Sequence, residues 1–187
     1  SRQFDISKID FDLLSREFAH TRRKNLLLRD LDELVNQQLS KMLFANPQRI
    51  DYYDRYQEII DAYNAEQNRA TIEKTFMDLM ELASSLDTEQ QRYVREGFSS
   101  DEELSVYDLL FSENLTKQEI ETIKKVSVDL LTKIKQQIAK LDHWTDKQET
   151  KAIVDNLIRN TLWQELPNSY DVSDIQTYQK KIYEYVY

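Results

Sequence analysis

Residues 116–138 read TKQEIETIKKVSVDLLTKIKQQI, and this stretch decides the fold class of the chain. Its apolar residues recur at spacings of three, four or seven, at Ile120, Ile123, Leu130, Ile134 and Ile138. Such spacings place side chains on one face of an α-helix. Thr116 and Glu119 form a capping box at its start, in which each side chain accepts a hydrogen bond from an N–H that the helix leaves unpaired. The stretch therefore predicts a long amphipathic helix.

The rest of the chain repeats this helical pattern, with no alternating pattern typical of strands. Apolar stripes of the same spacing run over 28–42, 53–63, 72–83 and 153–162. Four more capping boxes are predicted, at Thr88 with Gln91, Ser100 with Glu103, Thr145 with Gln148 and Ser173 with Gln176. Breaks fall at 46–49, 64–70, Gly97, 112–116, 142–146 and 167–172. We therefore predict an all-α fold, a compact irregular array of eight or nine helices with no β-sheet.

The length of 187 residues is typical of a single domain, so we expect residues 1–187 to form one helical domain. The loop at 112–116 is the best candidate boundary within it, giving subdomains 1–112 and 113–187. The first residue is serine rather than methionine, and we interpret this as the start of a processed product or of a fragment.

Gly97 is the single glycine of the chain, and cysteine is absent. Walker loops, dinucleotide-binding turns and nucleophile elbows all need several glycines, so the sequence excludes these sites. Without cysteine there is no thiolate metal site, and a reducing compartment such as the cytoplasm is expected. The longest apolar runs are a few residues, so we expect neither a membrane span nor a membrane partner.

Charge is distributed unevenly in a chain of net charge −9. Such a balance opposes a protein whose main task is to bind DNA. Arg22, Arg23, Lys24 and Arg29 nevertheless form a basic cluster, and these four are the candidate phosphate contacts. The alternative interpretation is an ordinary solvated helix face.

Carboxylates and histidines offer no convincing catalytic or metal site. Glu17 and His20 have the i, i+3 spacing of di-iron bundles, but the second such pair that these bundles require is missing. The acidic residues at 51–54 and 101–103 lie in predicted first turns, where they complement the helix dipole. No catalytic, cofactor-binding or metal-binding residue is therefore predicted.

The eleven tyrosines are typical either of a protein interface or of an amphipathic core and rim.

Three segments together resemble a known family. They are NPQRIDYY at 46–53 with EIIDAYN at 58–64, REGF at 95–98 with EELSVYDLL at 102–110, and Trp144 with Lys147, Gln148, TKA at 150–152 and Leu166-Pro167. In order and spacing they resemble the C-terminal helical region of the motor-nuclease (R) subunit of type I restriction enzymes. The resemblance runs from about residue 9 to the end of the chain.

The resemblance implies that the chain is a C-terminal fragment of a larger multidomain subunit. That parent subunit would use ATP and Mg²⁺ for translocation and would cleave DNA, whereas this fragment would hold neither cofactor nor catalytic residue. Its expected partners are the methyltransferase (M) subunit and the M/S core, with DNA in the full complex and no small-molecule substrate. Tyr52, Tyr53, Trp144, Lys147 and Lys151 are the candidate interface residues. Two alternatives stay open, a self-contained helical enzyme or metal-bundle protein, and a direct DNA-binding module.

Overall fold

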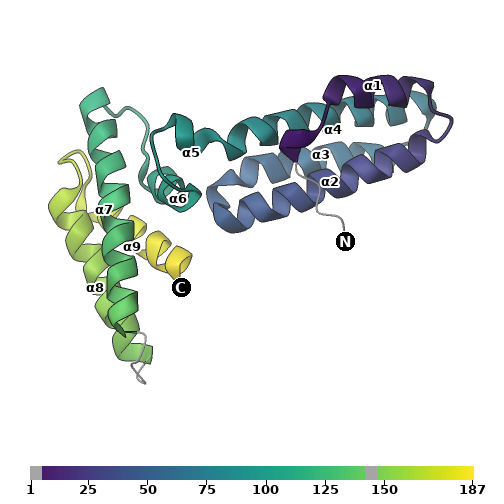
Figure 1. Cartoon of the computed structure of the whole chain (residues 1–187). Helices are drawn as coiled ribbons and strands as arrows, with labels where there is room; N and C mark the ends of the chain where they lie inside the picture. Colours follow the sequence, from purple (N-terminus) through teal and green to yellow (C-terminus); the bar gives the residue numbers. More distant parts are fainter. Residues whose placement is uncertain (1–5, 142–146) are drawn as a thin grey trace. The chain divides into compact units, whose positions relative to one another are not determined.

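The structure is a computed structural model and describes residues 6–141 and 147–187 (Figure 1). Over these residues the fold is all-α, with nine α-helices, two short 3₁₀ helices and no strand, which confirms the predicted fold class. The elements in chain order are η1 (Ile6–Lys8), α1 (Phe11–His20), α2 (Lys24–Ala45), η2 (Pro47–Arg49), α3 (Ile50–Ala65), α4 (Arg69–Gln90), α5 (Arg92–Arg95), α6 (Asp101–Leu110), α7 (Lys117–Leu141), α8 (Lys147–Glu165) and α9 (Val172–Val186).

The chain divides into two compact units, Ser1–Arg95 and Glu96–Tyr187. The division therefore lies at residues 95 and 96, earlier than the boundary that we expected in the 112–116 loop. The reason is that α6 packs against α7 and α9, so the helix before that loop belongs to the second unit.

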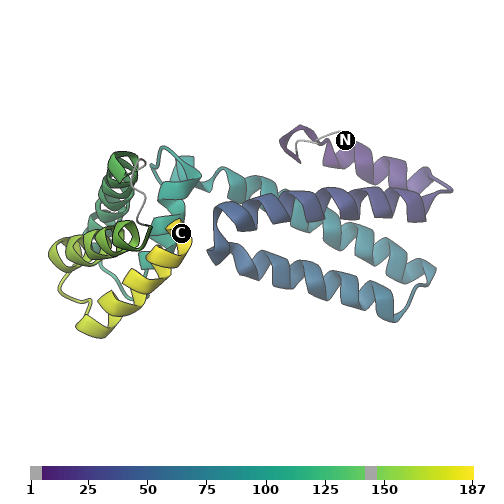
Figure 2. The same cartoon turned by 90° about the horizontal axis from the view of Figure 1, so that it is seen from below.

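In the first unit, α4 packs against both α2 and α3, and the three helices lie side by side (Figure 2). The core includes the whole predicted stripe of α2, namely Leu28, Leu31, Val35, Leu39 and Met42. Phe18 of α1 stacks on Phe76 of α4 with ring centroids 3.7 Å apart. The predicted stripe of α3 is less buried, because only Tyr56 of its tyrosines joins the core.

In the second unit, α7 packs against α6 and α8, and α9 packs against α6 and α8. Ile123, Leu130 and Ile134 of the quoted stretch are buried, which confirms its amphipathic character. Its last predicted core residue, Ile138, lies in the more exposed end of the helix. The Tyr170 hydroxyl donates a hydrogen bond to the backbone oxygen of Leu110 and so ties the loop before α9 to the end of α6.

The capping boxes are only partly as predicted. Thr116 with Glu119 forms the full reciprocal pair, and the Ser100 hydroxyl accepts from the Glu103 N–H at 3.2 Å. Thr88 is wrong as a cap, because α4 continues past it and its hydroxyl donates to the Ser84 oxygen one turn earlier.

The start of α9 is also corrected. Asp171 is its N-cap and forms the capping box with Asp174, so Ser173 lies inside the helix. The predicted box at Thr145 lies outside the described residues.

Gly97 follows α5 with a φ of +87°, the left-handed conformation expected of a glycine that ends a helix.

Candidate functional site

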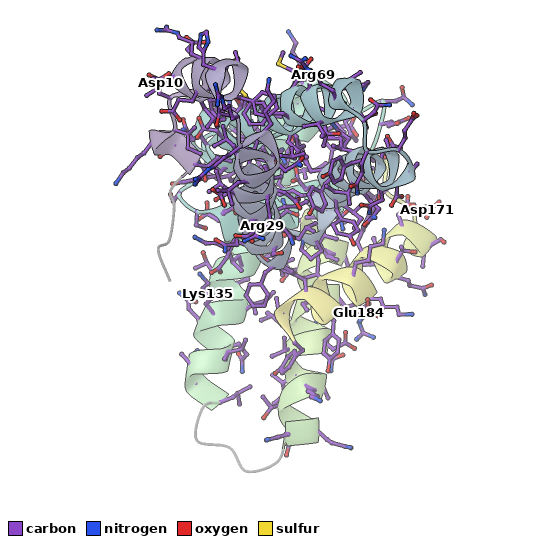
Figure 3. All side chains as sticks on the ribbon, turned by 90° about the vertical axis from the view of Figure 1, so that its right-hand side faces the viewer. Asp10, Arg29, Arg69, Lys135, Asp171 and Glu184 are labelled. Carbon is purple, nitrogen blue, oxygen red and sulfur yellow. The ribbon has the colours of Figure 1, made fainter. Side chains whose placement is uncertain are left out.

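The predicted phosphate contacts lie at the start of α2 and in the turn before it. Arg22 and Arg23 are exposed, and no carboxylate of the described residues lies within ion-pair distance of either. Lys24 already interacts with two groups of the fold, because its Nζ lies 3.5 Å from the Glu73 carboxylate and 4.7 Å from the Phe18 ring centroid. Arg29, which Figure 3 labels, lies on α2. Its side chain is 72% exposed and forms a loose ion pair of 3.8 Å with Glu33.

Beside this cluster, a pocket of about 500 Å³ lies between α2 and α3, and residues of α4 form its third wall. It exists because α4 packs closely on both helices while α2 and α3 touch each other little. The buried side chains of Leu28, Thr75 and Leu79 line it, with Leu26 and Arg29 among its more exposed lining residues. No local sequence pattern indicates this pocket, because it is formed by residues of three helices that are distant in the sequence.

The two candidate interface tyrosines have different surroundings. Tyr52 is half-buried, and its hydroxyl donates to Oε2 of Glu89 at 3.5 Å. Burial, and next the negative charge of Glu89, raises the pKa of Tyr52. Tyr53 is exposed beside Tyr56 and is therefore the more accessible of the pair.

Glu89 is also the centre of a buried ionic network that no local sequence pattern indicates. Arg49 donates from Nε to Oε1 of Glu89 at 3.2 Å and from Nη1 to the Met42 oxygen at 3.3 Å. Arg92 donates from Nε to both carboxylate oxygens of Glu89 at 3.0 Å. Arg49 belongs to the NPQRIDYY segment on which the family resemblance rests, and its role in the structure is to hold the α2–α3 turn against the end of α4.

The remaining candidates lie in the second unit. Lys147 and Lys151 are exposed on the first turns of α8, and Nζ of Lys151 lies 5.9 Å from the ring centroid of Tyr187. Trp144 lies outside the described residues.

Farther along α8, Trp163 is 59% exposed, and Arg159 one turn before it is exposed as well. Trp163 falls out of phase with the apolar stripe of α8, and this was the sequence signal that could have identified it.

Between α7 and α8, two carboxylates share one lysine. Nζ of Lys133 lies 3.0 Å from Asp129 and 3.4 Å from Glu165. Burial, and next a hydrogen bond with Asp129, raises the pKa of Glu165. The same hydrogen bond lowers the pKa of Asp129, so Glu165 is the member of the pair that takes up a proton first.

Within residues 6–141 and 147–187, no three His, Asp or Glu side chains are grouped so that they could hold a metal ion. The same part of the chain has no helix that is long and apolar enough to cross a membrane. The described surface thus offers exposed aromatic and basic side chains and a pocket between helices.

Comparison with known proteins gives the family. Residues 1–186 match the family model described as type I restriction enzyme HindI endonuclease subunit-like, C-terminal. The chain belongs to this family of C-terminal domains, as the resemblance predicted. No curated protein and no solved structure matches the chain.

Proposed function

We propose that this domain is a non-catalytic assembly module that attaches the ATP-dependent translocase and endonuclease subunit to the methyltransferase core of M and S subunits. Membership of a family of restriction-enzyme subunit domains supports a role within a multisubunit complex. ATP and Mg²⁺ would act in other parts of the parent subunit, as the resemblance implies.

The exposed indole of Trp163 is the observation that carries this proposal. A large apolar side chain that is 59% exposed on a regular helix loses contact with water when a partner covers it. Tryptophan and arginine are the residues most enriched in the energetic centres of protein interfaces, and Arg159 lies one turn away on the same helix. Lys147 and Lys151, near the start of α8, lie roughly 160° and 120° around the helix axis from Trp163, so they belong to another face of α8 and stay separate interface candidates.

The test is binding of the 187-residue chain to the purified M/S core, measured by calorimetry. We expect a dissociation constant in the micromolar range or below, and Trp163→Ala to weaken binding by roughly tenfold or more, as interface tryptophans do. Phe44→Ala is the matched control, because Phe44 is an aromatic residue 91% exposed in the first unit. Absence of binding by the unmodified chain would refute the assembly role, whereas equal losses in both variants would refute the assignment to α8.

A further inference from the structure

Residues 6–20, which comprise η1 and α1, form a strap that is attached to α4 near both of its ends. Ile6 and Phe18 are 0% and 6% exposed, whereas the apolar side chains between them are half-buried or exposed. η1 packs on α4, and the Phe18 ring stacks on Phe76 of the same helix at a centroid distance of 3.7 Å. Two buried side chains are therefore the anchors of the strap.

Polar bonds contribute little to the attachment of α1. In the part of the chain that the structure describes, no hydrogen bond or ion pair joins α1 to α2, α3 or α4. The cap of α1 is internal to the strap, because Asp10, labelled in Figure 3, accepts from the Leu13 N–H at 3.0 Å. Nζ of Lys24 lies 4.7 Å from the Phe18 ring centroid, a cation–π contact with the anchor itself. The attachment of α1 therefore depends mainly on Phe18.

The turn between α1 and α2 allows the strap to move without breaking α2. Residues 21–23 lie outside both helices, and Arg23, at the N-cap position of α2, makes no side-chain cap bond. The bond from the Arg23 N–H to the Thr21 hydroxyl, 3.1 Å long, lies within the turn itself. The buried stripe of α2 begins one turn later, at Leu28, and is formed independently of the hinge.

The strap is also the part of the first unit that is easiest to release. α1 has ten residues, and isolated helices shorter than about 12–15 residues are marginal in water. Its two anchors must offset the conformational entropy that the whole strap loses when it is ordered. α2, in contrast, contributes five buried side chains to the core. Local opening of the strap therefore requires less free energy than unfolding of the helices beneath it.

We propose that the strap is releasable: residues 6–20 leave α4 while α2, α3 and α4 stay folded, and the apolar surface around Phe76 then accepts an amphipathic helix in trans. The strap itself defines the occupant that fits, because Phe11, Leu14 and Phe18 recur on one face of its helix. A partner helix of this pattern would place an aromatic ring on Phe76. The inference is independent of the α8 face, since all of these residues belong to the first unit.

Hydrogen exchange of the 187-residue chain tests the release. We expect the amides of α1 to exchange at least about 100-fold faster than those of α2 and α4, because α1 exchanges through a local opening. Arg49→Met breaks the buried pair with Glu89 and should accelerate exchange in α2 and α4 about tenfold or more, while α1 changes less than about twofold. Equal protection of α1 and α2, or equal acceleration of both by Arg49→Met, would overturn the proposal.

Binding of a labelled peptide of residues 6–20 tests the uncovered surface. In the unmodified chain the strap competes at an effective concentration of about millimolar, so the peptide should bind weakly. Phe18→Ala in the chain removes the competing anchor and should tighten peptide binding about tenfold or more. Leu13→Ala, at a position of α1 that is 51% exposed, is the matched control and should change the affinity less than about twofold.

The sign of the effect separates release of the strap from loss of structure, because a chain that had lost its fold would bind the peptide less. Circular dichroism verifies that the helices are retained, and Phe18→Leu, with a smaller expected gain, replaces Phe18→Ala if they are not. No gain in the chain variant would overturn the proposal. Equal binding of a peptide that itself carries Phe18→Ala would overturn it as well, since the anchor would then be unnecessary.

Discussion

In the first unit, Nε of Arg49 lies 3.2 Å from Oε1 of Glu89, and the two side chains are only 2% and 7% exposed. The pair joins the 3₁₀ turn between α2 and α3 to the end of α4, 40 residues farther along the chain. Because both groups have left water, each depends on the other for the interactions that solvent no longer supplies. Arg92 reinforces the carboxylate from a more exposed position.

Arg49→Met should lower the free energy of unfolding by about 3 kcal/mol, because it leaves the buried Glu89 with one cation fewer. Arg92→Met should cost roughly 1 kcal/mol, since this arginine is partly exposed and solvent replaces part of its contribution. Urea denaturation followed by circular dichroism measures both values. Equal losses in the two variants would contradict the different roles of the two arginines.

Asp171→Ala should destabilise the second unit by about 1 kcal/mol, because it removes the oxygen that accepts from the Asp174 N–H at 2.8 Å and caps α9. Ser173→Ala is the matched control and should change the free energy of unfolding little, since Ser173 lies inside the helix. Amide hydrogen exchange in α9 reports the two effects separately. A larger loss of stability from Ser173→Ala than from Asp171→Ala would indicate that Ser173 is the N-cap, as the sequence pattern predicts.

Gly97→Ala should cost about 1 kcal/mol, because a φ of +87° is strained for a residue with a Cβ atom. A Cβ at this position would meet no atom within 4 Å, so the loss comes from the backbone and not from crowding. Gly97→Asn should cost less, since asparagine tolerates this region, as Asn114 does here at a φ of 67°. Thermal unfolding of both variants compares them, and an equal fall in midpoint would exclude backbone strain as the cause.

The pH dependence of stability should depend on Glu165. Its pKa is raised in the folded state, so folding binds a proton there, and its contribution to stability falls as pH rises through the folded pKa. Asp129 acts in the opposite sense, because its lowered pKa gives stability that is lost only as pH falls below its usual range. As the pH rises above the usual range of a glutamate, Glu165→Gln should therefore remove a decline in stability that the unmodified chain shows.

Urea denaturation at pH 5 and pH 7 measures this difference. Glu184→Gln, at an exposed position of α9, is the control and should leave the pH dependence unchanged. An identical pH dependence in Glu165→Gln and in the unmodified chain would show that the pair with Asp129 does not affect stability.

Most of the secondary structure could be predicted, because an α-helix depends on residues three and four apart in the chain. The stripe of 116–138 and the box of Thr116 with Glu119 both appear in α7. The errors came where two local signals competed. Asp171 and Ser173 both fit the start of α9, and the structure uses the aspartate, whose negative charge also interacts favourably with the helix dipole.

The candidate sites were predicted less well, because exposure and pairing depend on distant parts of the chain. The Tyr52 hydroxyl donates a hydrogen bond to Glu89, 37 residues away in the chain, and Lys24 forms an ion pair with Glu73. Tyr53, Lys147 and Lys151 are exposed as an interface requires, and their role stays a prediction.

The sequence by itself determined an all-α chain, the position of its helices and the family to which it belongs, since hydrophobic period, caps and ordered motifs are all local. The tertiary structure alone decided the boundary between the units, the burial of Arg49 with Glu89 and the pocket beside Arg29. These features arise when helices pack, and packing depends on which faces meet across tens of residues. A periodic pattern shows that one face of a helix is apolar, but it does not show which other helix packs against that face.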